Sequence, residues 1–416
     1  MSILEKDMNK LVDYVIQENL PDEAVRKALS TKDFNKKLYV VAIGKAAWHM
    51  ANTASKKLGD KIVRGIVITK YEHSEGDIPK MEIIEAGHPL SDENTIRGTK
   101  KVVELAKTLT DEDEVLFLVS GGGSALFEEP LPGLTLEDIV DVNSQLLAAG
   151  ADIVEINIIR KRLSAVKAGR FAKLVSPASI FAIVLSDVLG DRLDSIASGP
   201  AHPDSSTTAD AKRIINKYNL KLTPLMVEFL EKETPKEVDN VETIITGSVV
   251  TLSRSAADIA KEMGYHPYVI CSNMNCEARE AGRLAAVIAS DIVSGKSDFK
   301  APCAIILGGE TVVNLKGSGK GGRNQELALS AAEGILGLDN VLIMSLGSDG
   351  TDGPTDAAGG WVDGTTYQAL KEKGISTYEA LQNNDAYNAL KAVNQLIITG
   401  PTGTNVNDVA VVFVGS

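Results

Sequence analysis

Short, almost wholly apolar segments recur along this chain, and each is followed by a turn rich in glycine, serine or aspartate. Residues 38–43, 114–119, 179–185 and 341–346 are the clearest of them. Continuous apolar runs of this length are typical of strands that are buried on both faces of a parallel sheet. Between them, apolar residues recur at the three- and four-residue spacing of amphipathic helices. The alternation predicts an α/β fold with an open, mostly parallel sheet flanked by helices.

The chain divides into two series of such elements. The first opens with an amphipathic helix at residues 3–19, and the second opens with a strand at residues 243–246. A polar, proline-containing stretch without periodicity, residues 232–240, separates the two series. We therefore expect two α/β domains, covering residues 1–238 and, for the smaller one, residues 239–416.

Composition and charge narrow the class of protein. The chain has 416 residues and a formal net charge of −13. An acidic chain lacks the general positive surface that attracts nucleic acids and anionic membranes, so neither is an expected partner. The N-terminal residues lack a signal-peptide pattern and no run reaches membrane-spanning length, which predicts a cytoplasmic protein. The three cysteines are odd in number and lack zinc-ligand spacing, which argues against a disulfide framework or a structural metal.

A glycine-rich loop at residues 308–329 lies between a buried strand and a helix. Glycines let main-chain N–H groups approach a ligand closely, and oxyanions bind at helix N-termini. We therefore expect this loop to bind the phosphates of a nucleotide through Gly317, Gly319, Lys320, Gly321 and Gly322. The alternative is a flexible surface hairpin with solvated charges. The loop also contains G-x-G-x-x-G, but not in the first βα turn of its unit, and it lacks the Ser or Thr of a Walker motif.

Two loops of the first series also follow buried strands. Lys45 lies at the carboxyl end of the strand at 38–43, where α/β sheets bind ligands, and it starts a helix. A cation is unfavourable at a helix N-terminus, so a bound phosphate or carboxylate would explain this lysine; a solvated lysine is the alternative. After the strand at 114–119, serines flank three glycines that can form a nest of N–H donors for a nucleotide. The residues of this loop are Ser120, Gly121, Gly122, Gly123 and Ser124.

Aspartates gather after two other strands. Asp187 and Asp191 follow the strand at 179–185, and Asp349 follows the strand at 341–346. Carboxylates in such places can hold Mg²⁺ or accept a proton from a hydroxyl nucleophile. We expect all three to be metal ligands and Asp187 also to be catalytic. Asx turns are the alternative.

Two other polar features receive no functional role. His88 precedes a proline at a strand end, where a histidine is as often structural as it is a ligand. A local basic cluster stands out in the acidic chain, and we expect most of it to face solvent. Its members are Lys161, Arg162, Lys167 and Arg170.

A series of short motifs spans nearly the whole chain. In order they are Ile43-Gly-Lys-Ala-Ala47, Ser120-Gly-Gly-Gly-Ser124, Ser186-Asp-Val-Leu-Gly-Asp191, Gly309-Glu-Thr311, Gly321-Gly-Arg-Asn-Gln-Glu326, Gly350-Thr-Asp-Gly-Pro-Thr-Asp356 and Thr399-Gly-Pro-Thr-Gly-Thr-Asn405. Together these motifs resemble the class II glycerate kinases, which are the glycerate 2-kinases of the MOFRL family. Each motif alone is unspecific, whereas their joint occurrence in this order is highly specific.

The resemblance implies ATP-dependent phosphorylation of D-glycerate on its 2-hydroxyl, with Mg²⁺ as a second cofactor. It also implies a cleft between an N-terminal Rossmann-like domain and a C-terminal α/β domain. Carried over by motif, Lys45 and Arg323 are the leading catalytic positions. We expect both to bind substrate together with Glu310 and Asn324. The expected partners are the small molecules D-glycerate and ATP, and the expected assembly is a monomer or a homodimer.

The residues fit this chemistry, and two other functions stay open. Phosphoryl transfer needs positioning and charge neutralisation, which Lys45 and Arg323 would supply, while Asp187 would orient or deprotonate the attacking hydroxyl. One alternative is an NAD(P)-dependent hydroxypyruvate reductase, which G-x-G-x-x-G superficially supports. It would need a fingerprint in a proper βαβ unit and a catalytic acid, usually His, which the loops of the second domain lack. The other is a non-enzymatic sugar-acid sensor.

Overall fold

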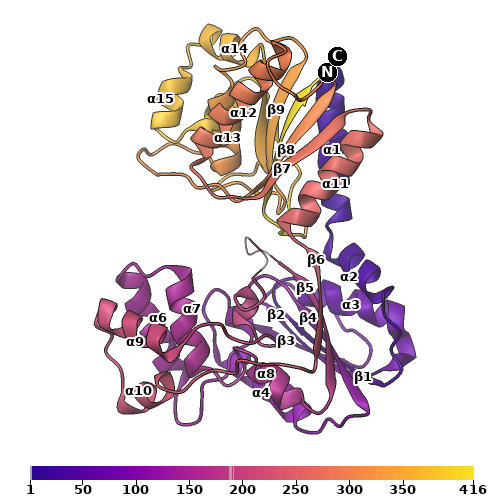
Figure 1. Cartoon of the computed structure of the whole chain (residues 1–416), viewed down its shortest axis with the longest axis vertical. Helices are drawn as coiled ribbons and strands as arrows, with labels where there is room; N and C mark the ends of the chain where they lie inside the picture. Colours follow the sequence, from indigo (N-terminus) through magenta and orange to yellow (C-terminus); the bar gives the residue numbers. More distant parts are fainter. Residues whose placement is uncertain (1, 187–189, 191) are drawn as a thin grey trace. The chain divides into compact units, whose positions relative to one another are not determined.

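The computed structural model describes residues 2–186, 190 and 192–416, and it falls into two compact units (Figure 1). The first, which we call the parallel-sheet unit, spans residues 24–246. The second, the mixed-sheet unit, combines the residues up to Glu23 with residues 247–416. Among the described residues, no helix has both the length and the apolar character that a membrane crossing requires.

The sheet of the parallel-sheet unit has the strand order β3-β2-β1-β4-β5-β6. The pairs from β3 to β5 in this order are all parallel. This is the order of the doubly wound Rossmann fold, in which the winding reverses between β1 and β4. The strands are β1 (Lys37–Ile43), β2 (Ile62–Lys70), β3 (Met81–Ala86), β4 (Asp113–Val119), β5 (Ser179–Leu185) and β6 (Val241–Gly247).

Helices cover both faces of this sheet because successive side chains of a strand point to opposite faces. Leu116 and Leu118 of β4 share one core with α2 (Pro21–Leu29) and α3 (Ala47–Leu58). Phe117 of the same strand shares the opposite core with α4 and α8. The remaining helices of the unit include four that form a small separate core, α6, α7, α9 and α10 (Figure 1). The bounds are α4 (Glu93–Ala106), α5 (Gly123–Leu126), α6 (Leu136–Ala148), α7 (Ile153–Leu163), α8 (Arg170–Val175), α9 (Thr208–Tyr218), α10 (Pro224–Leu230), and the 3₁₀ turns η1 (Gly59–Lys61) and η2 (Ile196–Ser198).

The sheet of the mixed-sheet unit has the order β11-β10-β9-β12-β8-β7. β7 and β8 are parallel, whereas β12 is antiparallel to both of its neighbours, β8 and β9. The antiparallel strands β10 and β11 extend the sheet beyond β9. The strands are β7 (His266–Met274), β8 (Cys303–Gly309), β9 (Val341–Gly347), β10 (Gly359–Asp363), β11 (Leu396–Ile397) and β12 (Asp408–Val414).

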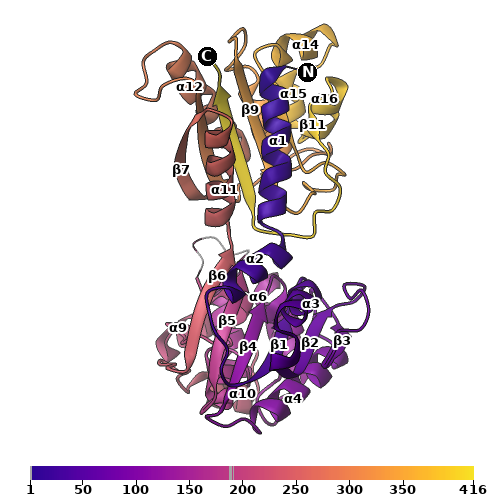
Figure 2. The ribbon, with the colours of Figure 1, turned by 90° about the vertical axis from the view of Figure 1, so that its right-hand side faces the viewer.

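The two faces of the mixed sheet are covered by helices from different parts of the chain. The N-terminal helix α1 (Ile3–Glu18) and α11 (Val249–Glu262) lie side by side over one face and share its core (Figure 2). The other face packs against helices that follow β7 in the sequence. These are α12 (Ala278–Val293), α13 (Arg323–Ala331), α14 (Thr366–Glu372), α15 (Thr377–Gln382) and α16 (Ala386–Ala392).

The predicted fold class of two α/β domains is confirmed. Two elements, however, belong to a different unit from the one that the sequence order suggested. The strand expected to open the second series is β6, and it closes the first sheet instead. The helix α1 packs in the mixed-sheet unit. The compact units therefore divide at Thr246 and Gly247, whereas the sequence predicted domains at residues 1–238 and 239–416.

Candidate functional site

The turn after β1 lies at the point where the winding of the parallel sheet reverses, beside the turn after β4. The Lys45 N–H donates to the Gly121 carbonyl over 2.9 Å, which ties the two turns together. Gly44 has φ +114°, and a Cβ there would lie 2.3 Å from Ser120 Oγ, so only glycine fits. The half-buried Lys45 ammonium has no hydrogen-bond or ion-pair partner within the part of the chain that the structure describes. The structure thus places an unpaired cation where doubly wound sheets bind ligands.

The loop at Ser120–Ser124 is built into its surroundings. The buried Ser120 Oγ accepts from the Ala46 N–H at 3.0 Å and donates to the Ile43 carbonyl at 3.3 Å, so this hydroxyl fastens the turn after β1. Gly122 has φ +82°, and a Cβ there would lie 2.9 Å from the ring of His88. Ser124 Oγ lies 2.7 Å from Ser198 Oγ. Nucleotide binding by these five residues stays a prediction.

His88, to which the sequence gave no role, lies beside this loop. A Cβ atom at Gly122 would contact both the His88 ring and the side chain of Lys45, so these three residues lie close together. Burial and the positive charge of Lys45 lower the pKa of His88, so the imidazole is neutral at pH 7. The sequence offered no signal for this placement, because β2 and β1 lie between β3 and β4 in the sheet, and the segments that follow β3 and β4 meet only through the fold.

The basic cluster was expected to face solvent, and that expectation is wrong. Lys161, Arg162 and Lys167 are buried and paired with carboxylates. Lys167 Nζ lies 2.8 Å from the buried Glu128 carboxylate and donates to the Ser124 carbonyl at 2.9 Å. Lys161 and Arg162 pair with the buried Asp204 at 3.3 and 3.5 Å, and the half-buried Arg170 donates to two backbone carbonyls. Of these four cations, Lys167 is the one that contacts the Ser124 loop.

In the mixed-sheet unit, the glycine-rich loop packs on a later segment of the chain. The Gly317 N–H donates to Asn384 Oδ1 at 3.0 Å, the Gly319 N–H to the Asn383 carbonyl at 2.8 Å, and the Lys320 N–H to Asp385 Oδ1 at 2.9 Å. A Cβ at Gly317 or Gly319 would lie within 2.4 or 2.5 Å of Asn383. The close approach of this backbone explains both glycines without a ligand.

The N-terminus of α13 already donates hydrogen bonds to a carboxylate of the protein itself. Asp352 accepts from the Asn324 N–H at 3.1 Å and from the Gln325 N–H at 2.9 Å, and a Cβ at Gly322 would lie 2.3 Å from it. Burial raises the pKa of Asp352 to about 6, against the effect of these hydrogen bonds. The buried Asn324 accepts a hydrogen bond from Ser345 at 2.6 Å. An external phosphate at this helix N-terminus would have to displace Asp352. Phosphate binding by the loop and substrate binding by Asn324 stay predictions.

Arg323, the first residue of α13, is held by two carboxylates. Its Nε and Nη2 bind both oxygens of Asp408 at 2.5 and 3.0 Å, and Nη1 lies 3.0 Å from Glu310. Burial lowers the pKa of Arg323, but the hydrogen bonds and charge of Asp408 outweigh burial and raise it. Glu310 is in turn bound by the Asn407 amide at 3.1 Å. The guanidinium is therefore charged and fixed in orientation, and about a third of its side chain is exposed.

The predicted metal ligands are not brought together within the described residues. Asp187 and Asp191 lie outside them. Asp349 Oδ1 accepts from the Thr351 N–H at 2.9 Å, which is an Asx turn, and no contact within the described residues engages its second oxygen. The described residues contain no group of three His, Cys, Asp or Glu side chains that could hold a metal ion.

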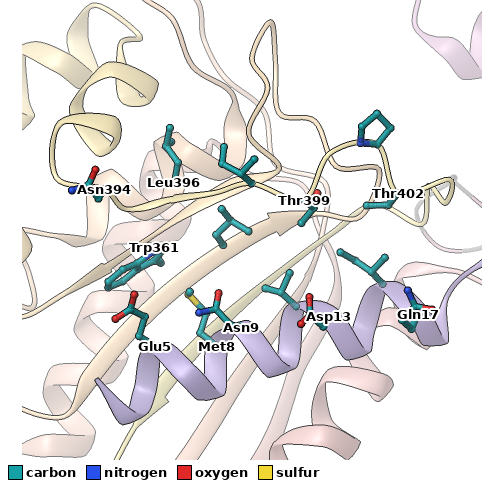
Figure 3. Close-up of a pocket in the computed structure, with 15 residues that line it drawn as sticks. Glu5, Met8, Asn9, Asp13, Gln17, Trp361, Asn394, Leu396, Thr399 and Thr402 are labelled. Carbon is teal, nitrogen blue, oxygen red and sulfur yellow. The ribbon is translucent and has the colours of Figure 1, made fainter. Parts of the chain in front are cut away.

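A cavity of about 630 Å³ lies on the α1 side of the mixed-sheet unit (Figure 3). Side chains of α1 face Trp361, Leu396 and Thr399 across it (Figure 3). None of the predicted site residues lines it, and two of its lining residues, Glu5 and Asp13, are acidic. Because these carboxylates would repel phosphate and carboxylate ligands, this cavity is a poor site for them.

Comparisons with known proteins bear on the whole chain. A family model described as a domain of unknown function, DUF4147, matches residues 7–231, and the MOFRL family model matches residues 303–408. A D-glycerate 2-kinase of Thermotoga maritima is 52% identical over 98% of each chain. A glycerate 2-kinase of Pyrococcus horikoshii is 39% identical over 98% of this chain and 96% of its own. A crystal structure of glycerate kinase from Thermotoga maritima superposes with a TM-score of 0.96, at 52% identity, over 99% of each chain.

Proposed function

We propose, since the chain belongs to the class II glycerate kinases of the MOFRL family, that it transfers the γ-phosphoryl group of ATP to the 2-hydroxyl of D-glycerate. The products are 2-phospho-D-glycerate and ADP. The observation that carries this proposal is the near full-length similarity to the D-glycerate 2-kinase of Thermotoga maritima. We also propose a cytoplasmic enzyme, either a monomer or a homodimer, with small molecules as its partners.

Two cations support phosphoryl transfer in different ways. Charge develops on the transferring phosphoryl group and on the two oxygens in line with it, so fixed positive groups stabilise the transition state. The Lys45 ammonium has no partner among the described residues and is free to meet a carboxylate or a phosphate. Arg323 keeps its charge and direction because Asp408 and Glu310 hold three of its nitrogens. In this proposal Asp187 orients the attacking hydroxyl or accepts its proton.

Mg²⁺, when bound together with the nucleotide, would supply positive charge that offsets the charge of the phosphates. It binds through one or two carboxylates, with substrate phosphates and water completing its shell. Asp349 fits this role, because the hydrogen bonds that its carboxylate accepts from described residues all go to Oδ1. Asp187 and Asp191 are the other ligands that we propose.

The reductase alternative receives no support from the turn where a dinucleotide would bind. The first βα turn of the Rossmann-ordered sheet reads Gly44-Lys-Ala-Ala47, without the glycine fingerprint. The G-x-G-x-x-G of the chain lies in the mixed-sheet unit, where its N–H groups at Gly317 and Gly319 already bind protein oxygens. A kinase needs neither feature.

One assay series separates the functions. D-glycerate with ATP and Mg²⁺ should yield ADP, and ³¹P NMR should identify 2-phosphoglycerate rather than 3-phosphoglycerate. Hydroxypyruvate with NADH or NADPH should leave the cofactor unoxidised. Oxidation of NADH or NADPH would support the reductase instead, and saturable binding without turnover would support a sensor. Near wild-type rates in Lys45→Met would remove Lys45 from the mechanism.

A further inference from the structure

Arg160 on α7 is a cation that forms no ion pair with the described residues. Its Nη1 donates to Ser124 Oγ at 2.9 Å, and no carboxylate of the described residues lies within ion-pair distance of it. The next two residues, Lys161 and Arg162, both pair with Asp204. The nearby Glu128 carboxylate forms its ion pair with Lys167 at 2.8 Å, and its charge offsets only part of the cost of burying Arg160. Arg160 therefore has most of its N–H donors available although burial makes its charge costly.

A chain of hydrogen bonds orients a second donor beside it. Ser198 Oγ donates to Asn157 Oδ1 at 3.2 Å and lies 2.7 Å from Ser124 Oγ. Since Ser198 donates to Asn157, it accepts from Ser124, which in turn accepts from Arg160. The amide oxygen of Asn157 is thus used, and its NH₂ group donates to no acceptor among the described residues. Asn157 and Arg160 are three residues apart in a helix, so they lie on the same face.

The backbone that supplies Ser198 is held in an unusual conformation. Ala197 and Ser198 have φ angles of 50° and 61°, in the left-handed region that side chains disfavour. Gly123 allows this segment to approach, because a Cβ at Gly123 would lie 2.9 Å from the Cβ of Ala197. Strained positions of this kind cluster at functional sites.

We propose that Asn157 and Arg160 form a donor-only subsite that binds an oxyanion group of a reactant, either the carboxylate of the hydroxy acid or a phosphate of the nucleotide. A guanidinium and an amide NH₂ group supply several N–H donors and no free acceptor, which suits an anion and excludes a cation. The subsite contacts Ser124, in the turn after β4 at the reversal point of the sheet, where doubly wound folds bind ligands. The assignment of the anion to glycerate or ATP rests on the proposed function.

The test uses the full-length protein and the variants Arg160→Met, Arg160→Lys and Asn157→Leu. Arg213→Met is the matched control, because Arg213 is an exposed arginine of the same unit. Steady-state KM values for D-glycerate and ATP are measured, together with the thermal stabilisation that each ligand alone gives. We expect Arg160→Met to raise KM for one reactant by about tenfold or more, since a hydrogen bond to a charged group is lost. The thermal shift from that same ligand should disappear.

The outcomes separate the sources of the anion. An effect confined to D-glycerate assigns the carboxylate, and an effect confined to ATP assigns a phosphate. Without ligand, Arg160→Met should melt at or above the wild-type temperature, because the cost of desolvating the Arg160 charge has been removed. A lower melting temperature with unchanged KM values and thermal shifts would overturn the proposal.

If Arg160→Met does not fold, unchanged ligand affinities in Arg160→Lys and Asn157→Leu would overturn it equally. Should the protein lack kinase activity, the thermal shifts still decide whether either ligand binds here.

Discussion

The ion pairs of Arg323 complicate any test of its proposed catalytic role. Asp408, its bidentate partner, is only 6% exposed, so Arg323→Met would leave a buried carboxylate without a counterion. Breaking such a pair costs about 3–5 kcal/mol. Loss of activity in the single variant would therefore not distinguish a catalytic defect from unfolding.

The double variant Arg323→Met/Asp408→Asn makes this distinction. We expect it to recover most of the lost stability, since both charges are gone, while kcat stays about 1000-fold or more below wild type. Urea unfolding and steady-state kinetics provide the two measurements. Arg283→Met, on the exposed face of α12, should change neither. A double variant with near wild-type kcat would show that Arg323 is structural only.

His202 gives the pH dependence of stability a specific source. Burial lowers its pKa to about 4, although Asp194 acts in the opposite direction. The unfolded side chain titrates near 6.5, so its stabilising contribution is complete above pH 6.5 and is lost as the pH falls through about 4. The stability that is lost over this pH range because of His202 is roughly 3 kcal/mol by linkage.

The variant His202→Asn should therefore lose less stability than wild type between pH 7 and pH 4.5, as measured by urea unfolding. Asp352 changes the stability in the opposite direction, because burial raises its pKa to about 6 and its contribution therefore increases as the pH falls. The comparison must accordingly be made between variant and parent at each pH. Parallel pH profiles for the two proteins would exclude His202 as the source.

At the scale of elements, the apolar runs were sufficient to predict the principal strands. Two were missed for identifiable reasons: β10 begins with two glycines, and β11 has only two residues. The loop at Gly317–Gly322 shows where local pattern fails. Its glycines suit a phosphate, yet Gly317 and Gly319 accommodate the backbone of Asn383, more than 60 positions later in the chain. The burial of Lys161, Arg162 and Lys167 also depends on distant carboxylates, so sequence spacing could not predict either feature.

Asn384 is one of three consecutive residues that bind the backbone of this loop, and its replacement tests the packing. Its Oδ1 accepts from the Lys316 and Gly317 N–H groups, and its amide donates to Glu326. Asn384→Gly keeps the positive φ of 55° available while removing these bonds. We expect a loss of about 1–3 kcal/mol and faster hydrogen exchange at residues 316–320, with or without ATP.

The exposed Asn388, whose amide binds Asp385, provides the control variant Asn388→Gly. A helix-interior glycine itself costs about 1 kcal/mol, so the exchange rates at residues 316–320 are the deciding measurement. Exchange that is unchanged in Asn384→Gly, or changed equally in both variants, would mean that Asn384 does not anchor the loop.

At the scale of the whole molecule, the mixed-sheet unit is built from both ends of the chain, and the parallel-sheet unit lies between these two segments in the sequence. The DUF4147 model begins at residue 7 and therefore includes most of α1, yet α1 packs on the mixed sheet together with α11. Six buried apolar side chains of α1 make this contact. Helical periodicity predicted α1 and its apolar face, but nothing in that pattern indicated which of two apolar sheets the face would cover.

Two identical substitutions close to each other in the sequence should consequently weaken different units. Leu11 is fully buried in the core of the mixed-sheet unit, and Leu29 is 3% exposed in the core of the parallel-sheet unit. Each Leu→Ala change should cost about 2–5 kcal/mol through lost burial and a residual cavity. Native-state hydrogen exchange should then accelerate at β9 and β12 in Leu11→Ala, and at β1 and β4 in Leu29→Ala. If Leu11→Ala instead loosened β1 and β4 alone, α1 would belong to the sheet nearest to it in sequence, and the division of the chain into these two units would be wrong.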